Sequence, residues 1–484
     1  MNYKLFFYLV PLFWFFNAGA QQSLSLEECK SMALEHNYKI RIAAEHVGAA
    51  NDLSKSARTA FLPNFSANGM YTRTNRQFSL LENDMIIPVI PFSTINPETG
   101  QFDPNLDPAN TFVMNPISGG ILLDKDGNPV FKNYAWLPKD QLKIGSKNTF
   151  IGGVSMFQPI YVGGKIRELY KISQYGENIA NSNKKVEQSE VLYSVEEAYW
   201  RVVSLQEKVK MVESYQQLLV NLSTDLENLY SEGIIIKNDL LKVQVKTNEV
   251  NLNILKAKNG LSLSRMALCQ LTGLPLSSTI VLTDSLSQTV HLAPEMAYTD
   301  SALVLRAELE ALRQGVNIAN SSVKVMKSRY LPNVGLTANY MLMNPNPYNG
   351  FAEEFGGDWN VGVGINIPIY HWNDRAHTLS AARHEQKVAE LKLQEAKEMI
   401  SLQVQQAIFL ASETAKKVIM AEENLKLAEE NLKVTTDSFN EGMVKTTDIL
   451  EAQAMWHDAL SELIDARMEN QLSIVNLQKV AGSF

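Results

Sequence analysis

Two carboxylates near the C-terminus have types and a spacing that could bind cations. Asp448 and Glu451 lie three residues apart at the predicted start of a helix, so their side chains share one face. Repeated around an oligomer, each would form a ring of carboxylates, which favours cations and can hold divalent ions. The simpler interpretation is that acidic residues are favoured at a helix N-terminus by the helix dipole.

Other chemistry is not indicated by the sequence. The chain has no nucleophile–base pattern, no phosphate-binding loop and no H-E-x-x-H motif. His371, His377 and His384 cluster in sequence, but the first follows a predicted strand and the others lie seven apart on a predicted helix. We therefore predict no enzyme activity, no cofactor and no metal site.

The segment 359–367 alternates with the period of a β-strand. Apolar residues at 359, 361, 363, 365 and 367 alternate with small or polar residues at 360, 362, 364 and 366. The preceding segment 333–340 alternates in the same way, and a turn sequence rich in Asn and Pro separates the two. Strands with lipid on one side and a watery lumen on the other have this pattern, so we predict a transmembrane β-hairpin.

Matching motifs recur at fixed offsets along the chain. Pro159-Ile-Tyr matches Pro368-Ile-Tyr, and Tyr230-Ser-Glu-Gly233 matches Phe439-Asn-Glu-Gly442, each 209 residues later. Asp239-Leu-Leu matches Asp448-Ile-Leu at the same offset, whereas Leu-Pro-Asn at Pro63 and Pro332 is offset by 269. The chain is thus predicted to be a tandem duplication, with an enlarged hairpin loop in the first copy. The four prolines, Pro63, Pro159, Pro332 and Pro368, are predicted to mark strand boundaries.

Composition limits the class of protein. A net charge of −8 argues against a nucleic-acid partner. Residues 1–20 have one early cation, a short apolar run and a final Ala-Gly-Ala, which predicts a signal peptide. No later run reaches the length of a spanning helix, so an outer-membrane location is expected. Cys29 and Cys269 could form a disulfide or simply be buried apolar residues.

The predicted organisation follows from these signals. Heptad spacing of apolar residues in the long helical segments favours coiled-coil packing. The loop 75–147 holds eight of the 17 prolines, and it is interpreted as a long hairpin loop or, alternatively, a small inserted domain. The predicted parts are the signal peptide 1–20; a first repeat 21–275 (a helix from Leu26 to Thr59, β-hairpin 62–161, helical hairpin 165–272); a linker 276–300; and a second repeat 301–484 (a helix from Asp300 to Arg329, β-hairpin 331–370, helical hairpin 373–482).

Four strands cannot close a barrel alone, because open strand edges are not tolerated in lipid. The chain must therefore contribute strands to a shared barrel, either as a dimer with about eight strands or as a trimer with about twelve. Each long helix exceeds the ~30 Å hydrocarbon thickness and is too polar to lie in it. The fold class is thus mainly α with transmembrane β-strands, and the helical hairpins are expected to project away from the membrane into the periplasm.

These residues resemble the TolC family of outer-membrane efflux proteins. The resemblance rests on the duplicated Leu-Pro-Asn and Pro-Ile-Tyr motifs, the step at Gly163-Gly164 and the two helix-tip motifs at 230–241 and 439–450. It implies a homotrimer with a twelve-stranded barrel and a periplasmic helical tunnel. It also implies docking to a periplasmic adaptor and an inner-membrane transporter, of the RND or ABC type, in tripartite efflux or type I secretion from a Gram-negative bacterium.

The resemblance places a gate at the helix tips. Asp448 and Glu451 then form an acidic ring at the entrance, and Asp239 is the partner from the first repeat. Phe439 stands where the family can place a Tyr, and Val444 where it can place a basic residue, so the closed state is expected to be held differently. The tip turns with their neighbours are expected to dock the adaptor: Gly233, Ile234, Ile235, Gly442, Met443 and Val444.

Two other classes fit parts of the pattern. A periplasmic adaptor also has long helical hairpins, but it would show one hairpin flanked by a compact β-domain. A structural coiled-coil protein of the envelope would lack the alternating strands. The duplication combined with lipid-type strands favours passive export through an outer-membrane duct over both.

Overall fold

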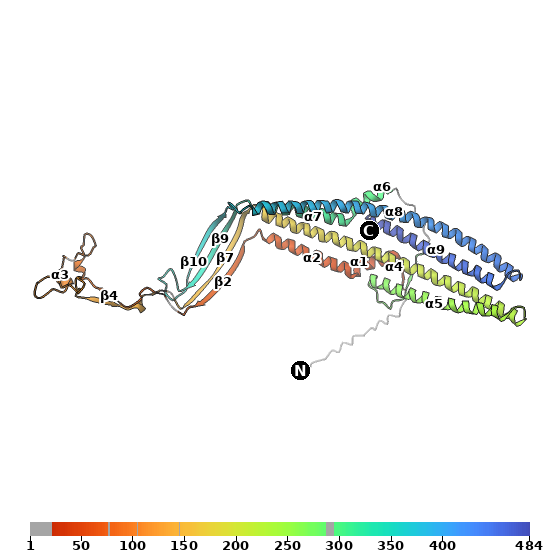
Figure 1. The fold of residues 1–484 in the computed structure, drawn as a ribbon, viewed down its shortest axis with the longest axis horizontal. Coiled ribbons are helices and arrows are strands. Elements are labelled where there is room, and N and C mark those ends of the chain that lie inside the picture. Colours follow the sequence, from red (N-terminus) through yellow and green to blue (C-terminus); the bar gives the residue numbers. More distant parts are fainter. Residues whose placement is uncertain (1–21, 76–77, 104, 145, 287–294) are drawn as a thin grey trace, which may run out of the picture. The chain divides into compact units, whose positions relative to one another are not determined.

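The computed structural model describes residues 22–75, 78–103, 105–144, 146–286 and 295–484, so the predicted signal peptide lies outside the described residues. The chain forms two compact units. One comprises Ala60–Val162 and Pro332–Ile367 and contains a four-stranded sheet. The other comprises Met1–Thr59, Gly163–Leu331 and Pro368–Phe484, and its described residues are mainly helical (Figure 1).

The sheet draws two strands from each half of the chain. It contains β2 (Asn64–Arg73), β7 (Asn148–Val162), β9 (Asn333–Asn344) and β10 (Gly356–Asn366). The order is β10-β9-β7-β2 and every pairing is antiparallel. Among the described strands, β10 and β2 therefore each keep one unpaired edge.

In two adjacent rows of the sheet, the register separates polar from apolar side chains. Residues paired across neighbouring strands lie in one row on one face, and successive rows alternate between the faces. The row Ser66, Ser155, Asn339 and Asn360 is polar. The next row lies on the other face and consists of Ala67, Val154, Tyr340 and Trp359. Trp359 is 70% exposed, as expected for a face that another apolar phase must cover.

One predicted strand end is wrong. β7 continues through Pro159 to Val162, and its register against β9 shifts between Pro159 and Tyr161. Proline has no N–H to give to the ladder, and a bulge removes the need for one at that point. Pro63 and Pro332 directly precede β2 and β9, and Pro368 lies two residues beyond the end of β10.

The loop 75–147 has structure of its own. β3 (Phe78–Ser79) pairs with β6 (Lys143–Ile144), and β4 (Met85–Pro88) pairs with β5 (Tyr134–Leu137). Short helical turns occur at Phe92–Thr94, Pro108–Thr111 and Lys139–Gln141. Phe112 is buried, and its ring lies 4.9 Å from that of Phe131. These features favour the small inserted domain over an irregular loop.

Two very long helices dominate the helical unit. α4 (Lys165–Ser231) and α8 (Asp374–Asn440) each have 67 residues, which corresponds to roughly 100 Å at ~1.5 Å per residue. After a tight turn each is followed by a returning helix, α5 (Lys237–Thr272) or α9 (Thr446–Val480). Ile236 is the N-cap of α5, and no side chain caps this helix start.

The two shorter predicted helices are each interrupted once, which corrects the expectation of single helices. The first is divided into α1 (Leu26–His36) and α2 (Tyr38–Thr59), and the second into α6 (Glu295–Leu305) and α7 (Ala307–Ser328). At the first break, the Asn37 side chain accepts a hydrogen bond from the Lys39 N–H at 2.9 Å and donates one to the Leu271 carbonyl at 3.1 Å. Such side-chain bonds compete with a continuous helix.

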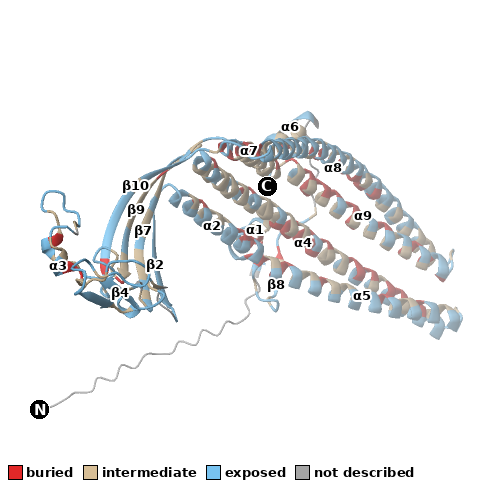
Figure 2. Cartoon of the chain, turned by 60° about the vertical axis from the view of Figure 1, so that its left-hand side comes forward, coloured by how far each residue is buried: buried red, intermediate tan, exposed pale blue. Residues whose placement is uncertain are grey.

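The helices of this unit form a layer with α4, α7 and α9 on the inside. α2 and α5 pack against α4, α4 packs against α7 and α9, and both of these pack against α8. Buried residues are concentrated on α4 and α9, two of the inner members (Figure 2). Within the described part of the unit, α8 therefore lies at one border of the layer, and α2 and α5 lie at the other.

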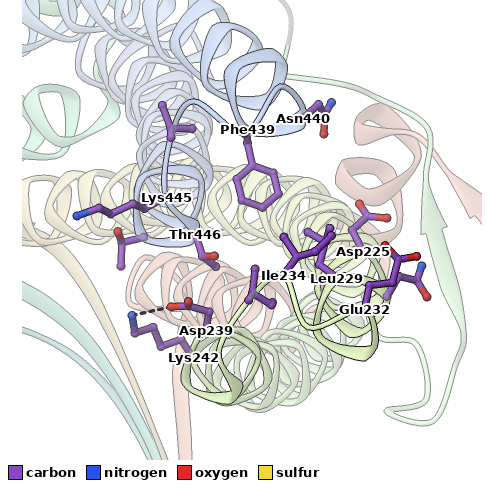
Figure 3. Close-up of a pocket in the computed structure, with 15 residues that line it drawn as sticks. Asp225, Leu229, Glu232, Ile234, Asp239, Lys242, Phe439, Asn440, Lys445 and Thr446 are labelled. Atoms are coloured by element: carbon purple, nitrogen blue, oxygen red, sulfur yellow. Dashed lines mark hydrogen bonds and ion pairs between the residues drawn. The ribbon is translucent and has the colours of Figure 1, made fainter.

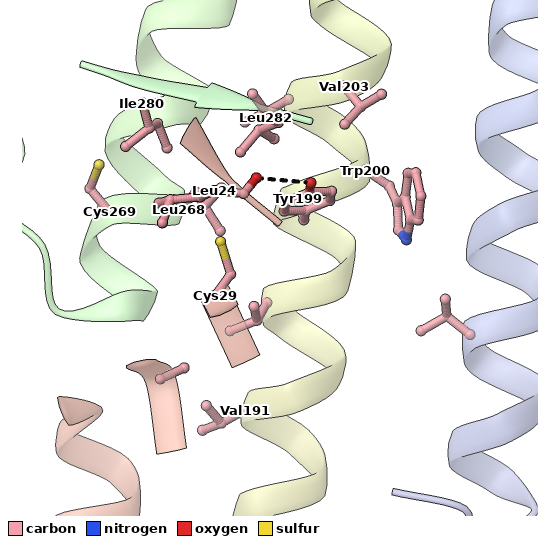
Figure 4. Close-up of a cluster of buried hydrophobic side chains, with 14 of the residues drawn as sticks. Leu24, Cys29, Val191, Tyr199, Trp200, Val203, Leu268, Cys269, Ile280 and Leu282 are labelled. Carbon is pink, nitrogen blue, oxygen red and sulfur yellow. Dashed lines mark hydrogen bonds between the residues drawn. The ribbon is translucent and has the colours of Figure 1, made fainter. Parts of the chain in front are cut away.

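A small parallel strand pair closes the largest core cluster. β1 (Gln22–Leu24) pairs with β8 (Ile280–Leu282), and the buried Tyr199 hydroxyl donates to Asp284 Oδ2 at 2.6 Å and approaches the Leu24 carbonyl at 3.2 Å (Figure 4). Cys29 and Cys269 are both free and buried in this cluster. Burial raises the pKa of Cys29 to about 12, so its thiol stays protonated at neutral pH.

Gly163 and Gly164, between β7 and α4, allow a matched test of how closely the chain approaches the end of α7. Both residues have positive φ, but a Cβ on Gly163 would lie 2.9 Å from Leu331 Cβ, whereas one on Gly164 would meet nothing within 4 Å. Both alanine variants should lose about 1 kcal/mol to backbone strain, and Gly163→Ala should lose a further ~1–3 kcal/mol to overpacking. Thermal unfolding followed by circular dichroism compares them. Equal midpoints for the two variants would contradict the close approach.

Candidate functional site

The turns of the two long helical hairpins lie together and line an open cavity of about 850 Å³ (Figure 3). Phe439 points into it from the end of α8. The first hairpin supplies Asp225, Asn228, Leu229, Glu232, Ile234, Ile235, Asp239 and Lys242; the second supplies Phe439, Asn440, Gly442, Val444, Lys445, Thr446 and Thr447. The structure thus brings together two tips that lie about 200 residues apart in the sequence.

The two turns have the same backbone geometry. Gly233 and Gly442 both have φ +74°. The following residues, Ile234 and Met443, each donate a backbone hydrogen bond of 2.9 Å to the carbonyl five residues earlier. This is the Schellman arrangement, in which a residue in the left-handed region ends the helix, and glycine adopts that region without strain. The duplicated glycines are therefore explained by the turn itself.

The apolar residues of the tips divide into two groups. Ile234 and Met443, which occupy equivalent positions in the two repeats, are 64% and 71% exposed. Ile235 and Phe439 instead pack against the buried cluster of Leu222, Leu226, Val243 and Ile449. Val444 is half-buried and lines the cavity. Ile236 is 65% exposed and was not singled out from the sequence, although three consecutive isoleucines at a helix turn could have indicated it.

The predicted acidic residues do not all reach the cavity. Asp239 lines it and forms an ion pair of 3.1 Å with Lys242, one turn along its own helix. Asp448 is exposed outside the cavity, and its Oδ2 accepts a hydrogen bond of 2.9 Å from the Lys445 N–H. Glu451 is exposed as well. In one chain, Asp448 therefore serves as a cap of α9, which agrees with the simpler interpretation of this acid.

The two tips differ in charge at positions that lie 209 residues apart. The offset of 209 residues aligns Asp239 with Asp448 and Lys242 with Glu451. The first tip therefore carries a neutralised pair, whereas the second carries two carboxylates. Sequence reasoning also missed Asp225 and Glu232, which line the cavity from the last turns of α4. Their position just before the predicted turn was the available signal.

The described residues contain no cluster that could hold a metal ion and no helix that could span a membrane. Within the described residues, no group of three or more His, Cys, Asp or Glu is placed to hold a metal ion. His371 contacts the Arg375 guanidinium instead. In the part of the chain that the structure describes, none of the helices is both long and apolar enough to cross a membrane.

Comparison with known proteins gives a consistent result. Residues 299–483 match the model of the outer membrane efflux protein family. The alkaline protease secretion protein AprF of Pseudomonas aeruginosa is 21% identical over 343 residues, covering 69% of this chain and 70% of that protein. The outer membrane protein TolC of Vibrio cholerae is 22% identical over 330 residues, covering 66% and 75%. The Campylobacter jejuni CmeC outer membrane channel has the same fold, with a TM-score of 0.68 at 16% identity over 94% of this chain and 85% of that one.

Two substitutions of Asp448 separate the effect of its hydrogen bond to the Lys445 N–H from the effect of its charge. Asp448→Ala removes the acceptor, so the start of α9 should lose about 0.5–2 kcal/mol. Asp448→Asn keeps an acceptor and removes only the charge. Hydrogen exchange of the Lys445 amide should therefore accelerate in the alanine variant and remain near the wild-type rate in the asparagine variant. Equal acceleration in both would mean that the charge, and not the hydrogen bond, holds the turn.

Proposed function

Because this chain belongs to the outer membrane efflux protein family and has a TolC-like fold, we propose that this outer-membrane channel is the exit duct of a tripartite efflux or type I secretion system. Substrate would pass from the periplasm to the exterior without chemical change, driven by an inner-membrane pump of the RND or ABC type. The observation that carries the proposal is a four-stranded sheet with one polar face, one apolar face and two unpaired edges.

The unpaired edges of β10 and β2 require a second copy. Backbone groups exposed to hydrocarbon cost several kcal/mol each, so both edges must pair. Joining β10 of one copy to β2 of the next adds four strands per copy. Eight strands leave an interior that side chains fill, whereas twelve leave room for passage. A homotrimer with a twelve-stranded barrel is the smallest assembly that closes and conducts.

The helical unit supports the same ring. Its border helices carry apolar side chains on their exposed faces, with spacings of seven and eleven residues that keep them on one side of a helix. On α8 these are Leu402, Phe409, Met420, Leu427 and Val434; on α5 they are Val245, Leu252 and Leu263. Val434 and Val245 lie at similar distances from the tips. We infer that α8 of one copy covers α5 of the next.

Cysteine cross-linking tests this seam. In Val434→Cys/Val245→Cys, an oxidant should link neighbouring copies into dimers and trimers on a denaturing gel. The control Val434→Cys/Leu263→Cys keeps both cysteines on the same faces but separates them by roughly 30 Å along the helices. It should remain monomeric. The buried Cys29 and Cys269 should not react. Linking of the control, or no linking of the test pair, would exclude this packing.

The tips are proposed as the adaptor-docking surface and the gate. The exposed apolar pair Ile234 and Met443 fits an apolar surface on a periplasmic adaptor. In the trimer, Asp448 and Glu451 would each form a ring of three carboxylates at the entrance, with Asp239 on the neighbouring hairpin. The closed state would be held by apolar packing of Phe439, because this side chain has no hydroxyl to donate a hydrogen bond.

Single-channel conductance in a planar bilayer tests the duct and its entrance together. The purified wild-type protein should give small cation-selective steps that millimolar divalent cation suppresses from the helical side. Asp448→Ala/Glu451→Ala should weaken this block by removing the carboxylates. Glu423→Ala, on the exposed body of α8, serves as a charge control and should leave the block intact. Failure of the folded oligomer to insert would refute the duct, and an unchanged block in the double variant would refute only the acidic entrance.

A further inference from the structure

The polar face of the sheet is almost free of charge. Across β2, β7, β9 and β10, only Arg73 and Asp358 carry ionised side chains. The row Ser66, Ser155, Asn339 and Asn360 runs across all four strands, with hydrogen bonds of 2.7 Å between the two serines and 2.9 Å between the two asparagines. Neutral groups of this kind can solvate ions of either sign, so this row gives no preference for cations or anions.

The strand register places the two charged side chains on opposite faces. Asp358 lies in a row of paired residues that continues through Met341, Gly153 and Asn68. Asn68 is two residues from Ser66 on β2, so this row lies on the polar face. Arg73 is an odd number of residues from Asn68 on the same strand, so it belongs to the face of Ala67 and Tyr71. No arginine or lysine of the four strands therefore shares the face of Asp358.

Asp358 is held in a defined position on this face. Its side chain is exposed, and Oδ1 accepts a hydrogen bond of 2.8 Å from the Trp359 N–H. The hydroxyl of Tyr348, in the preceding turn between β9 and β10, is hydrogen-bonded to the same carboxylate. Both partners are neutral, so they orient the carboxylate and leave its negative charge uncompensated. Gly153 in the same row has no side chain that could cover it.

We propose that Asp358 determines the charge selectivity of the barrel lumen, as a cation-attracting ring at its outer end that is separate from the acidic tips. The proposal rests on the proposed function, because the polar face must line the lumen of a trimer. Asp358 lies at the end of β10 that joins the hairpin turn, and the other end of β10 leads to α8. With the helices in the periplasm, the ring of three carboxylates faces the exterior. Its effect should be strongest at low salt, because exposed charges are screened within about 10 Å at 0.1 M.

The test compares reversal potentials in a KCl gradient for channels inserted from one side of a bilayer. The polar helices cannot cross the bilayer, so they remain on the side of addition and fix the orientation. Asp358→Asn should lower the K⁺/Cl⁻ permeability ratio by about two- to fivefold at 0.1 M salt and by less at 1 M. It should also weaken the effect of Mg²⁺ added to the opposite, exterior side. Asp358→Glu should keep both properties.

Two control variants show whether the changes in permeability ratio and Mg²⁺ effect come from Asp358. Arg73→Gln changes the other charged strand residue, on the apolar face, and should leave the ratio unchanged. Asp448→Ala/Glu451→Ala should alter Mg²⁺ block from the helical side but not from the exterior side. A wild-type ratio in Asp358→Asn, or an equal change in Arg73→Gln, overturns the inference while the duct itself still conducts. Absence of wild-type channels would instead refute the proposed function, and this inference with it.

Discussion

Unpaired backbone groups cannot face hydrocarbon, and this constraint governs the architecture of the chain. A sheet of four strands has two open edges, and nothing else in the described chain pairs with β10 or β2. The polar and apolar faces are already complete within one chain, because the register puts Asn339 and Asn360 on one side and Tyr340 and Trp359 on the other. One chain therefore has both kinds of face that a barrel wall needs, but its four strands are too few to close a barrel. In the proposed trimer, neighbouring copies would supply the remaining strands, and they would also cover the apolar side chains that are exposed on α8 and α5.

The two predicted repeats contribute matching elements to the sheet and to the helical unit. Each repeat contributes two strands and a helical hairpin, and the β7–β9 pairing joins the repeats in the sheet as the packing of α4 against α7 and α9 joins them in the helical unit. The enlarged first hairpin is the main departure, and its own strand pairs and aromatic cluster allow it to extend beyond the sheet without disturbing the register of β2 against β7.

Sequence patterns predicted the features that local chemistry determines. The period of two in 333–340 and 359–367 located β9 and β10, and the glycines at 233 and 442 located the helix turns, because only a residue tolerant of positive φ fits there. The helix break at Asn37 was missed because it depends on the carbonyl of Leu271, far away in the sequence. Pro159 was misplaced as a strand end because the bulge that accommodates it arises only when β7 meets β9. The acids of the tip were located as a helix start, but whether they face the cavity depended on rotation of α9, which no local pattern specifies.

The two helix tips have the same backbone geometry but carry different charges. The two tips share φ values, Schellman bonds and an aspartate near the start of the returning helix, yet Lys242 neutralises the first aspartate and Glu451 adds to the second. In the sheet, a charge on the lipid-facing side costs ~2–4 kcal/mol near the bilayer midplane and much less near its borders. Arg73 is the last residue of β2, which would place it near such a border in the proposed barrel. No comparable penalty excludes charge from the polar face, but that face carries only Asp358 along the strands. In the proposed assembly, this face would line a passage between the acidic tips and the Asp358 ring, so that entry and exit would discriminate between ions while the neutral surface between them would not.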